Sequence, residues 1–166
     1  MPISLNHVVT SSSNPVDICV TGHSLGGTLS VALGLALTDL QGDTWDKNNQ
    51  AVVSVISSAG ATAGDADFAQ YYDQRLGTRT NRIWNKIDMV PHAWQSDMLL
   101  NIPNLYYPHI VPSALIYVLS DGALVGSKLA GTLKHVNAQS PGLPGQVNLD
   151  LIYEIGWTQL VSILYT

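Results

Sequence analysis

The chain has 166 residues, a net charge of −5 and only 11% charged residues. The length fits one domain with a sizeable core, and the scattered basic residues argue against a nucleic-acid-binding surface. The single cysteine, Cys19, excludes an internal disulfide, and the apolar runs are too interrupted to predict a transmembrane helix. The first residues lack the basic and apolar regions of a secretory signal, and localisation is left open.

The first half of the chain alternates between short β-branched runs and helix-forming runs. The strand at 16–21 is expected to bury Cys19, and the next helix, apolar nearly all round, is expected to be buried. This alternation is typical of parallel βαβ units, so we expect one α/β domain over residues 1–166, mostly a parallel sheet flanked by helices. The expected elements are strands at 16–21, 51–60 and 81–88 and helices at 25–40 and 65–76, with Gly77 as the stop signal.

The second half has a different character. Prolines at 103, 108 and 112 predict an irregular segment with short turns. A helix is expected over 113–131, with a break at Gly122 as an alternative. A short strand at 132–138, a loop and a last helix at 148–166 complete the chain.

The segment Gly22-His23-Ser24-Leu25-Gly26 matches G-x-S-x-G between an expected strand and an expected helix. Such a turn holds its serine in a strained conformation, and glycines at both ends avoid collisions with the strand and the helix. Ser24 is therefore a candidate nucleophile, and the Leu25 amide is a candidate donor to an oxyanion. The alternative is a glycine-rich turn that happens to carry a serine.

A serine nucleophile needs an acid and then a histidine later in the chain. Asp88 stands at the C-terminal end of an expected strand and is the candidate acid. Asp65 and Asp67 also follow a strand, but they are better explained as a helix cap and a first-turn charge. Among the later histidines, His92 is too close to Asp88 in the chain to be oriented by its carboxylate. His135 is the candidate base that is best placed by its distance along the chain. A surface strand residue is the alternative for His135.

Two segments, "VTGHSLGGTLSVALGLAL" and "RIWNKIDMVPHAW", together resemble the class 3 lipases, and the similarity continues through "IPNLYYP" and "PGLPG". The resemblance implies a partial α/β-hydrolase fold with its nucleophile elbow at 22–26, and the roles of nucleophile, acid and oxyanion donor for Ser24, Asp88 and Leu25. About 15 residues precede the elbow strand, so the chain resembles the C-terminal part of such a domain. Family members are often secreted. Gln159 stands near the position of the family's histidine, which leaves His135 as the predicted base.

The expected function is hydrolysis of carboxylic esters of lipids through an acyl-enzyme, without a metal or other cofactor. Alternatives are a truncated module with little catalysis and a phospholipase A1-type acyl hydrolase. The expected partners are an ester substrate, a lipid–water interface and a second copy bound at an exposed sheet edge, with no nucleic acid. Candidates for an acyl site, with ordinary core as the alternative, are Trp84, Trp94, Leu105, Tyr106 and Tyr107.

Overall fold

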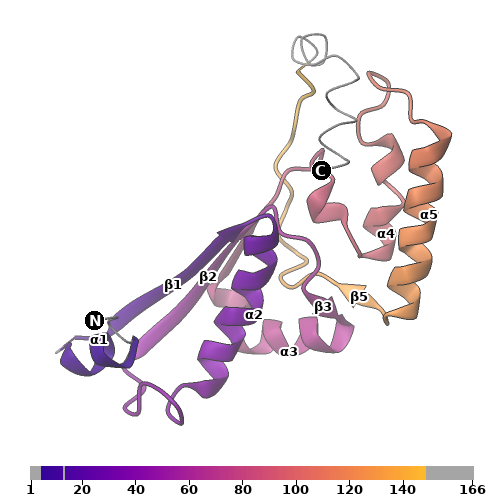
Figure 1. Ribbon diagram of the computed structural model, residues 1–166. Coiled ribbons are helices and arrows are strands. Elements are labelled where there is room, and N and C mark those ends of the chain that lie inside the picture. Colours follow the sequence, from indigo (N-terminus) through magenta and orange to yellow (C-terminus); the bar gives the residue numbers. More distant parts are fainter. Residues whose placement is uncertain (1–4, 13, 149–166) are drawn as a thin grey trace.

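The computed structural model describes residues 5–12 and 14–148. Its main sheet has three parallel strands in the order β1-β2-β4, with Val16 opposite Ala51 and His23 opposite Ser58 (Figure 1). The strands are β1 (Val16–His23), β2 (Ala51–Ser58) and β4 (Thr80–Ile83). The expected parallel βαβ order is present. Because parallel strands end at the same edge, the segments that follow β1, β2 and β4 meet there.

One face of the sheet carries the core. Helix α2 (Leu25–Leu40) packs on β1 and β2, and α3 (Ala66–Leu76) lies beside it (Figure 1). The contact is close at Gly34, where an added Cβ would lie 2.3 Å from Val55 Cγ2. The buried cluster between these helices and the sheet comprises Val31, Leu35, Val55, Ala69, Tyr72, Leu76 and Val136.

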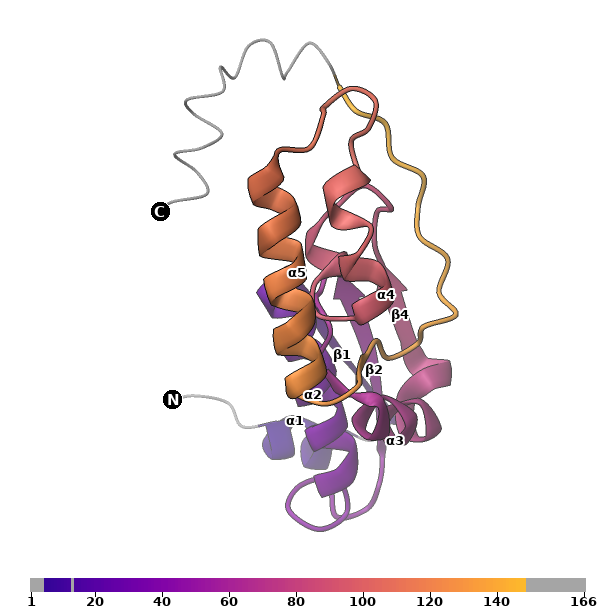
Figure 2. The same cartoon turned by 90° about the vertical axis from the view of Figure 1, so that its right-hand side faces the viewer.

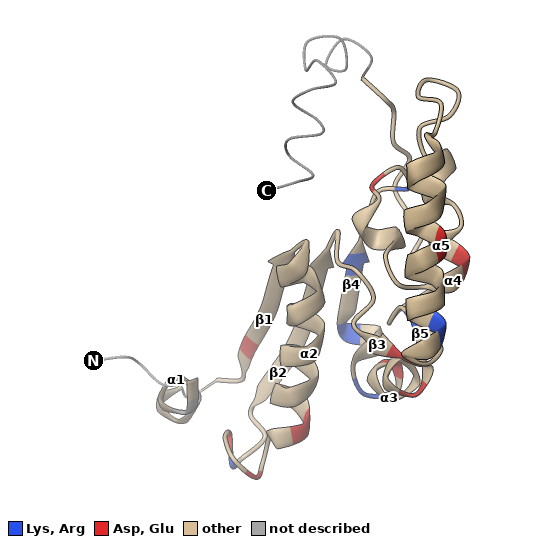
Figure 3. Ribbon diagram, turned by 45° about the vertical axis from the view of Figure 1, so that its right-hand side comes forward, with Lys and Arg blue, Asp and Glu red and all other residues tan. Residues whose placement is uncertain are grey.

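The opposite side of α2 is exposed, so the expectation of a fully buried helix is wrong. Leu25, Leu29 and Leu33 follow one another at helical spacing with 69%, 58% and 54% of their surface exposed. Figure 3 shows that helix α2 carries almost no charged residues. The expectation that Cys19 is buried is also wrong. Every second residue of β1 is exposed, Cys19 is one of these, and β1 is an edge strand of the sheet.

Local hydrogen bonds set the ends of two elements. Helix α3 begins where the Asp65 carboxylate accepts the Phe68 amide at 2.8 Å, which confirms the expected cap. Strand β4 is shorter than the expected 81–88. Just beyond it, Asn85 Oδ1 accepts the Ile87 amide and the Asn85 carbonyl accepts the Asp88 amide, which turns the chain away from the sheet.

The remaining helices include one that the sequence did not predict, α1 (Leu5–Ser11). The proline-rich segment, expected to be irregular with short turns, contains three short helices: η2 (Val90–His92), α4 (Ser96–Leu99) and η3 (Ile102–Asn104). Helix α5 (Ala114–Leu129) continues through Gly122 and runs beside α4 (Figure 2). Within the described residues, no helix has the length and apolar character needed to cross a membrane.

Two minor elements complete the fold. The expected strand at 132–138 is reduced to β5 (Leu133–Lys134), which pairs antiparallel with β3 (Gly64–Asp65). A one-turn helix, η1 (Gly77–Arg79), follows α3. The expected helix at 148–166, with Gln159, falls outside the described residues except for its first residue.

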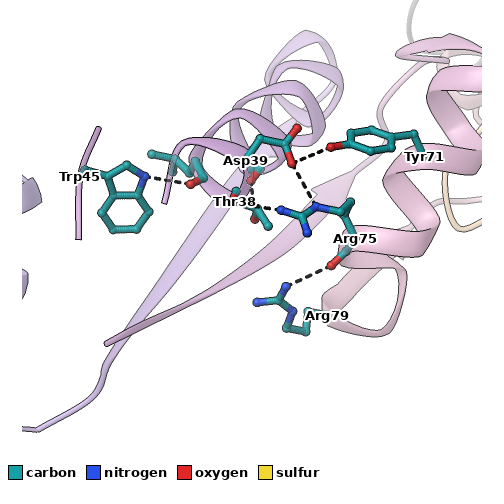
Figure 4. A network of polar contacts seen from close by, with 8 residues as sticks. Thr38, Asp39, Trp45, Tyr71, Arg75 and Arg79 are labelled. Carbon is teal, nitrogen blue, oxygen red and sulfur yellow. Dashed lines mark hydrogen bonds and ion pairs between the residues drawn. The ribbon is translucent and has the colours of Figure 1, made fainter. Parts of the chain in front are cut away.

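A small polar network joins the outer ends of α2 and α3 (Figure 4). Asp39 accepts hydrogen bonds from the Tyr71 hydroxyl and from Arg75 Nε, both at 3.0 Å. The hydrogen bond to Asp39 raises the pKa of the Tyr71 hydroxyl. Because the Arg75–Asp39 pair is well exposed, it orients the two helices and contributes little to stability.

Asp46 organises the connection between α2 and β2. Its Oδ2 accepts from Gln41 Nε2 at 2.7 Å and from the Ala51 amide at 2.8 Å, and its Oδ1 accepts from the Gln50 amide at 3.0 Å. Burial alone would raise the pKa of this carboxyl, but these three hydrogen bonds leave it below its ordinary value. The ionised carboxylate is therefore part of the fold.

We expect Asp46→Asn to lower the free energy of unfolding by about 1–3 kcal/mol, because one acceptor becomes an N–H group that faces other donors. Asp43→Asn, at an exposed position in the same loop, should change it by less than about 0.5 kcal/mol. Urea titrations at several pH values measure both. The lowered pKa means that this contribution is present above the unfolded-state value of 3.8 and is lost as pH falls through the folded-state pKa. A constant difference at all pH values would contradict this account.

Candidate functional site

Ser24 occupies the turn between β1 and α2 in a backbone conformation that few non-glycine residues adopt. Its φ and ψ are 57° and −122°, and its amide donates to the Ser58 carbonyl at 3.0 Å. The side chain makes no capping bond to the helix that it precedes. Backbone strain of this kind costs about 1–3 kcal/mol, and it is typically found at functional sites.

Glycines allow the strand and helix to approach at this turn. A Cβ on Gly22 would lie 2.1 Å from the Gly26 carbonyl oxygen, as expected for the first glycine of the motif. The expectation of a similar collision at Gly26 is wrong, because a Cβ there meets nothing within 4 Å. The second close approach is at Gly27, whose Cβ would lie 2.6 Å from the Ser58 carbonyl oxygen.

These distances predict opposite effects for two neighbouring substitutions. Gly27→Ala should lower the free energy of unfolding by about 1–3 kcal/mol, because the start of α2 must move off β2. Gly26→Ala should raise it by about 0.5–1 kcal/mol, because alanine is the better helix former and has room. Chemical denaturation compares the two variants with the unchanged chain. Equal losses for both would show that Cβ contacts do not decide the glycine requirement.

An apolar pocket of about 400 Å³ opens beside Ser24. It lies between the start of α2 and the segments that follow β2 and β4, with α4, η3 and α5 closing its other sides. Leu25 is the first residue of α2, and the first amides of a helix have no partner within the helix. The described residues that line the pocket are Ser24, Leu25, Thr28, Ala61, Met89, Val90, Ala93, Trp94, Leu99, Ile102 and Ala123.

A second apolar pocket of about 180 Å³ shares Met89 and Ile102 with the first. Of the aromatic acyl-site candidates, Trp94 lines the first pocket and Tyr106 the second. Burial and the nearby charge of Asp88 raise the pKa of the Tyr106 hydroxyl.

Three of the acyl-site candidates lie elsewhere. Trp84 instead packs edge-on against His92 and beneath the Arg82 guanidinium. Tyr107 is 65% exposed, and Leu105, half-buried, lines neither pocket.

Asp88 lies in the turn after β4, next in sequence to two residues of the Ser24 pocket, Met89 and Val90. The structure thus brings the Asp88 segment and Ser24 to the same edge of the sheet. The Asp88 carboxylate accepts the Val90 amide at 3.0 Å, and its backbone carbonyl faces His92 Nδ1 at 2.8 Å. His92 is therefore tied to the backbone of Asp88.

His135 is buried, and it is not among the described residues that line the Ser24 pocket. Its Nε2 lies 2.7 Å from the Pro91 carbonyl oxygen and 3.4 Å from Thr62 Oγ1, so this nitrogen carries a proton and donates. Burial, with the positive charge of Arg82 nearby, lowers the pKa of His135 to about 4. No histidine is among the described residues that line the pocket.

Arg82 extends from β4 into the interior beside this histidine. Its guanidinium lies 4.8 Å from the centre of the Trp84 ring, and burial lowers its pKa to about 10. One nitrogen, Nη2, is buried without a hydrogen-bond partner among the described residues. Residues 5–12 and 14–148 contain no cluster of three side chains suited to a metal ion.

Sequence reasoning missed most of the pocket wall. In the segment "RIWNKIDMVPHAW", sequence analysis singled out Asp88, although the next two residues, Met89 and Val90, line the pocket. Thr28, one helical turn after Ser24, lines it as well, and its hydroxyl donates to the Ala61 carbonyl at 3.2 Å. The i, i+4 spacing of Ser24 and Thr28 was a usable signal once the helix was predicted.

Comparisons with known proteins bear on the family and the fold of this chain. The family model described as "Lipase (class 3)" matches residues 2–98. Phospholipase A1-Igamma2, chloroplastic, of Arabidopsis thaliana is 28% identical over 145 residues, which are 84% of this chain and 25% of that protein. The crystal structure of M37 lipase superposes with a TM-score of 0.78 at 35% identity over 90% of this chain and 44% of its own. The chain thus spans less than half of either protein.

Proposed function

The chain belongs to the class 3 lipase family, and on that premise we propose that it hydrolyses carboxylic esters of lipids with Ser24 as the nucleophile. The observation that carries the proposal is the strained turn at Ser24 beside an apolar pocket of about 400 Å³. A strained serine between a parallel strand and a helix, next to space for an apolar group, suits acyl transfer. The M37 lipase and the Arabidopsis phospholipase support an acyl hydrolase.

Ser24 and Leu25 supply the nucleophile and one oxyanion donor of the proposed reaction, whereas its base is not among the described residues that line the pocket. Ser24 Oγ adds to the ester carbonyl carbon and gives up its proton to a base, while the Leu25 amide donates to the carbonyl oxygen as it becomes negative. Collapse of this intermediate breaks the bond to the alcohol, which leaves with a proton. Water then adds to the acyl-enzyme, releases the fatty acid and restores the Ser24 hydroxyl. The Asp88 carboxylate supplies the negative charge that favours a protonated base.

The pocket walls suggest where the acyl chain lies. Ser24 and Thr28 are the polar members of a lining that is otherwise alanine, leucine, isoleucine, valine, methionine and tryptophan. The second pocket shares Met89 and Ile102 with the first, so it lies next to it, and we propose that a longer acyl chain extends from the first pocket toward the second. We expect medium-chain esters to be preferred over the shortest ones for this reason.

A second candidate function is an acyl-binding module with little turnover. The observation that favours it is the lack of a histidine among the described residues lining the pocket. A serine without its base retains roughly 10³–10⁴-fold acceleration over water from the oxyanion site and substrate binding. Ser24 of such a protein would be acylated slowly, and the acyl-enzyme would be hydrolysed even more slowly.

A fluorophosphonate probe and p-nitrophenyl esters of several chain lengths test both candidates on the full chain. The Ser24 oxygen displaces fluoride from the probe, and peptide mapping then locates the adduct. Labelling at Ser24 together with sustained ester turnover is the expected result. Labelling or a burst of nitrophenol without turnover favours the second candidate. The absence of labelling at Ser24 and of ester cleavage would refute the hydrolase.

A further inference from the structure

Residues 88–94, the 88–94 loop, connect the candidate acid to the wall of the Ser24 pocket. Side chains donate to four of its backbone carbonyls: His92 Nδ1 to Asp88 at 2.8 Å, His135 Nε2 to Pro91 at 2.7 Å, the Thr62 hydroxyl to Ala93 at 2.8 Å, and the Ser127 hydroxyl to Trp94. Three of these donors, His135, Thr62 and Ser127, come from outside the loop. The loop is therefore held in place by side chains from distant parts of the chain.

His135 makes the connection that spans the largest number of residues along the chain. It lies 44 residues after Pro91, directly beyond β5, and only 3% of its surface is exposed. Its backbone amide donates to Gln95 Oε1 at 3.0 Å, so it contacts both the loop and the residue that follows the loop. Thr62 lies 3.4 Å from the same imidazole nitrogen and joins the histidine to the Ala93 carbonyl.

The pairing of His135 leaves it poorly suited to proton transfer at Ser24. The Nε2 proton is directed at a backbone carbonyl, and the ring is not among the described residues lining the pocket. A base must instead lie within hydrogen-bond reach of the serine oxygen. The same pairing is well suited to holding a loop, because a buried donor and acceptor that lose each other both remain unsatisfied.

We infer that His135 is a positioning residue, which fixes the 88–94 loop through the Pro91 carbonyl and thereby places Asp88, Val90 and Ala93 around Ser24. The inference rests on the proposed function for the role of Asp88, but the loop geometry stands without it. Hydrogen exchange reports this geometry directly, since the Val90 amide donates to the Asp88 carboxylate and the Ala93 amide donates to the Val90 carbonyl.

The decisive comparison is between His135→Gln and His135→Leu. Glutamine can place an N–H donor near the position of Nε2, whereas leucine has no donor and a similar bulk. We expect His135→Leu to speed exchange of the Val90 and Ala93 amides about tenfold, the factor for one lost hydrogen bond, and His135→Gln to restore most of the protection. Thr62→Val, which removes the hydroxyl and keeps the shape, should act in the same direction if His135→Leu does not fold.

Two control variants separate loop positioning from general loss of stability. Tyr72→Phe removes the 2.7 Å hydrogen bond to Thr80 in the core, so it should weaken the fold without selective exposure of the Val90 amide. His109→Gln, at an exposed histidine, should change neither exchange nor activity. Exchange measured by NMR on the full chain under native conditions makes the comparison residue by residue.

Activity gives the second readout. For the positioning role, kcat for the p-nitrophenyl esters should fall about tenfold in His135→Leu with KM nearly unchanged, and His135→Gln should recover it. A loss of roughly 10⁴-fold or more in His135→Gln would identify His135 as the base and overturn the inference. Unchanged Val90 exchange in His135→Leu would overturn it as well. An inactive unchanged chain would refute the proposed function, and the exchange measurements would still decide the role of His135.

Discussion

Replacement of Ser24 by alanine should abolish fluorophosphonate labelling and lower ester hydrolysis by roughly 10⁴–10⁶-fold, because the proposed covalent step has no other nucleophile. The variant should fold, since the Ser24 side chain makes no capping bond to α2. Denaturant titration and kcat/KM for p-nitrophenyl esters measure the two properties separately. Ser24→Gly should be equally inactive but about 1–2 kcal/mol more stable, because glycine relieves the strain at a φ of 57°.

Ser54→Ala is the matched control for this experiment. Ser54 lies on β2, and its hydroxyl makes only a 3.4 Å contact with the Ile18 carbonyl. The Ser54→Ala variant should keep nearly the activity and the stability of the unchanged chain. If Ser24→Ala retained more than about a tenth of the hydrolysis, another group would have to be the nucleophile. A tenfold fall in rate raises the barrier by only about 1.4 kcal/mol, which is the loss of one modest interaction.

Asp88→Asn should lower kcat by about 10⁴-fold with little change in stability, as expected when a triad acid loses its charge. The asparagine carbonyl can still accept the Val90 amide that Asp88 Oδ1 accepts at 3.0 Å, so the 88–94 loop keeps its shape. Only the negative charge and the second acceptor are removed. Steady-state kinetics and the rate of probe labelling measure the effect.

The control for charge alone is Asp97→Asn, at an exposed position in the first turn of α4. It should leave kcat within about twofold, because a solvent-exposed charge there is screened. A similarly small change in Asp88→Asn would reduce Asp88 to a loop residue that holds the Val90 amide. The proposed catalytic mechanism would then lack its acid.

Local signals in the sequence predicted much of the fold around Ser24. The spacing of Gly22 and Ser24, the β-branched run before them and the helix-forming run after them gave the turn and the bounds of α2. The Asp65 cap also followed from a local pattern. Such features depend on a few adjacent residues, which is why one sequence is enough to predict them.

Three expectations that failed or stay predictions depend on contacts between distant segments. Neither the exposure of Cys19 nor the open outer face of α2 could be read from apolar runs, because apolarity does not tell which face another element covers. The surroundings of His135 depend on pairing with Pro91, 44 residues away. Chain order alone made it a candidate base, and nothing local indicated that its ring faces a carbonyl.

The exposed Cys19 has a practical consequence. It is the only thiol in the chain, and it lies on β1 five residues before Ser24. At about 3.3 Å per residue, a maleimide dye there would be about 16 Å along the strand from the serine. Together with a fluorescent phosphonate on Ser24, this dye would report changes in the distance between Cys19 and Ser24. No engineered cysteine is needed for this measurement.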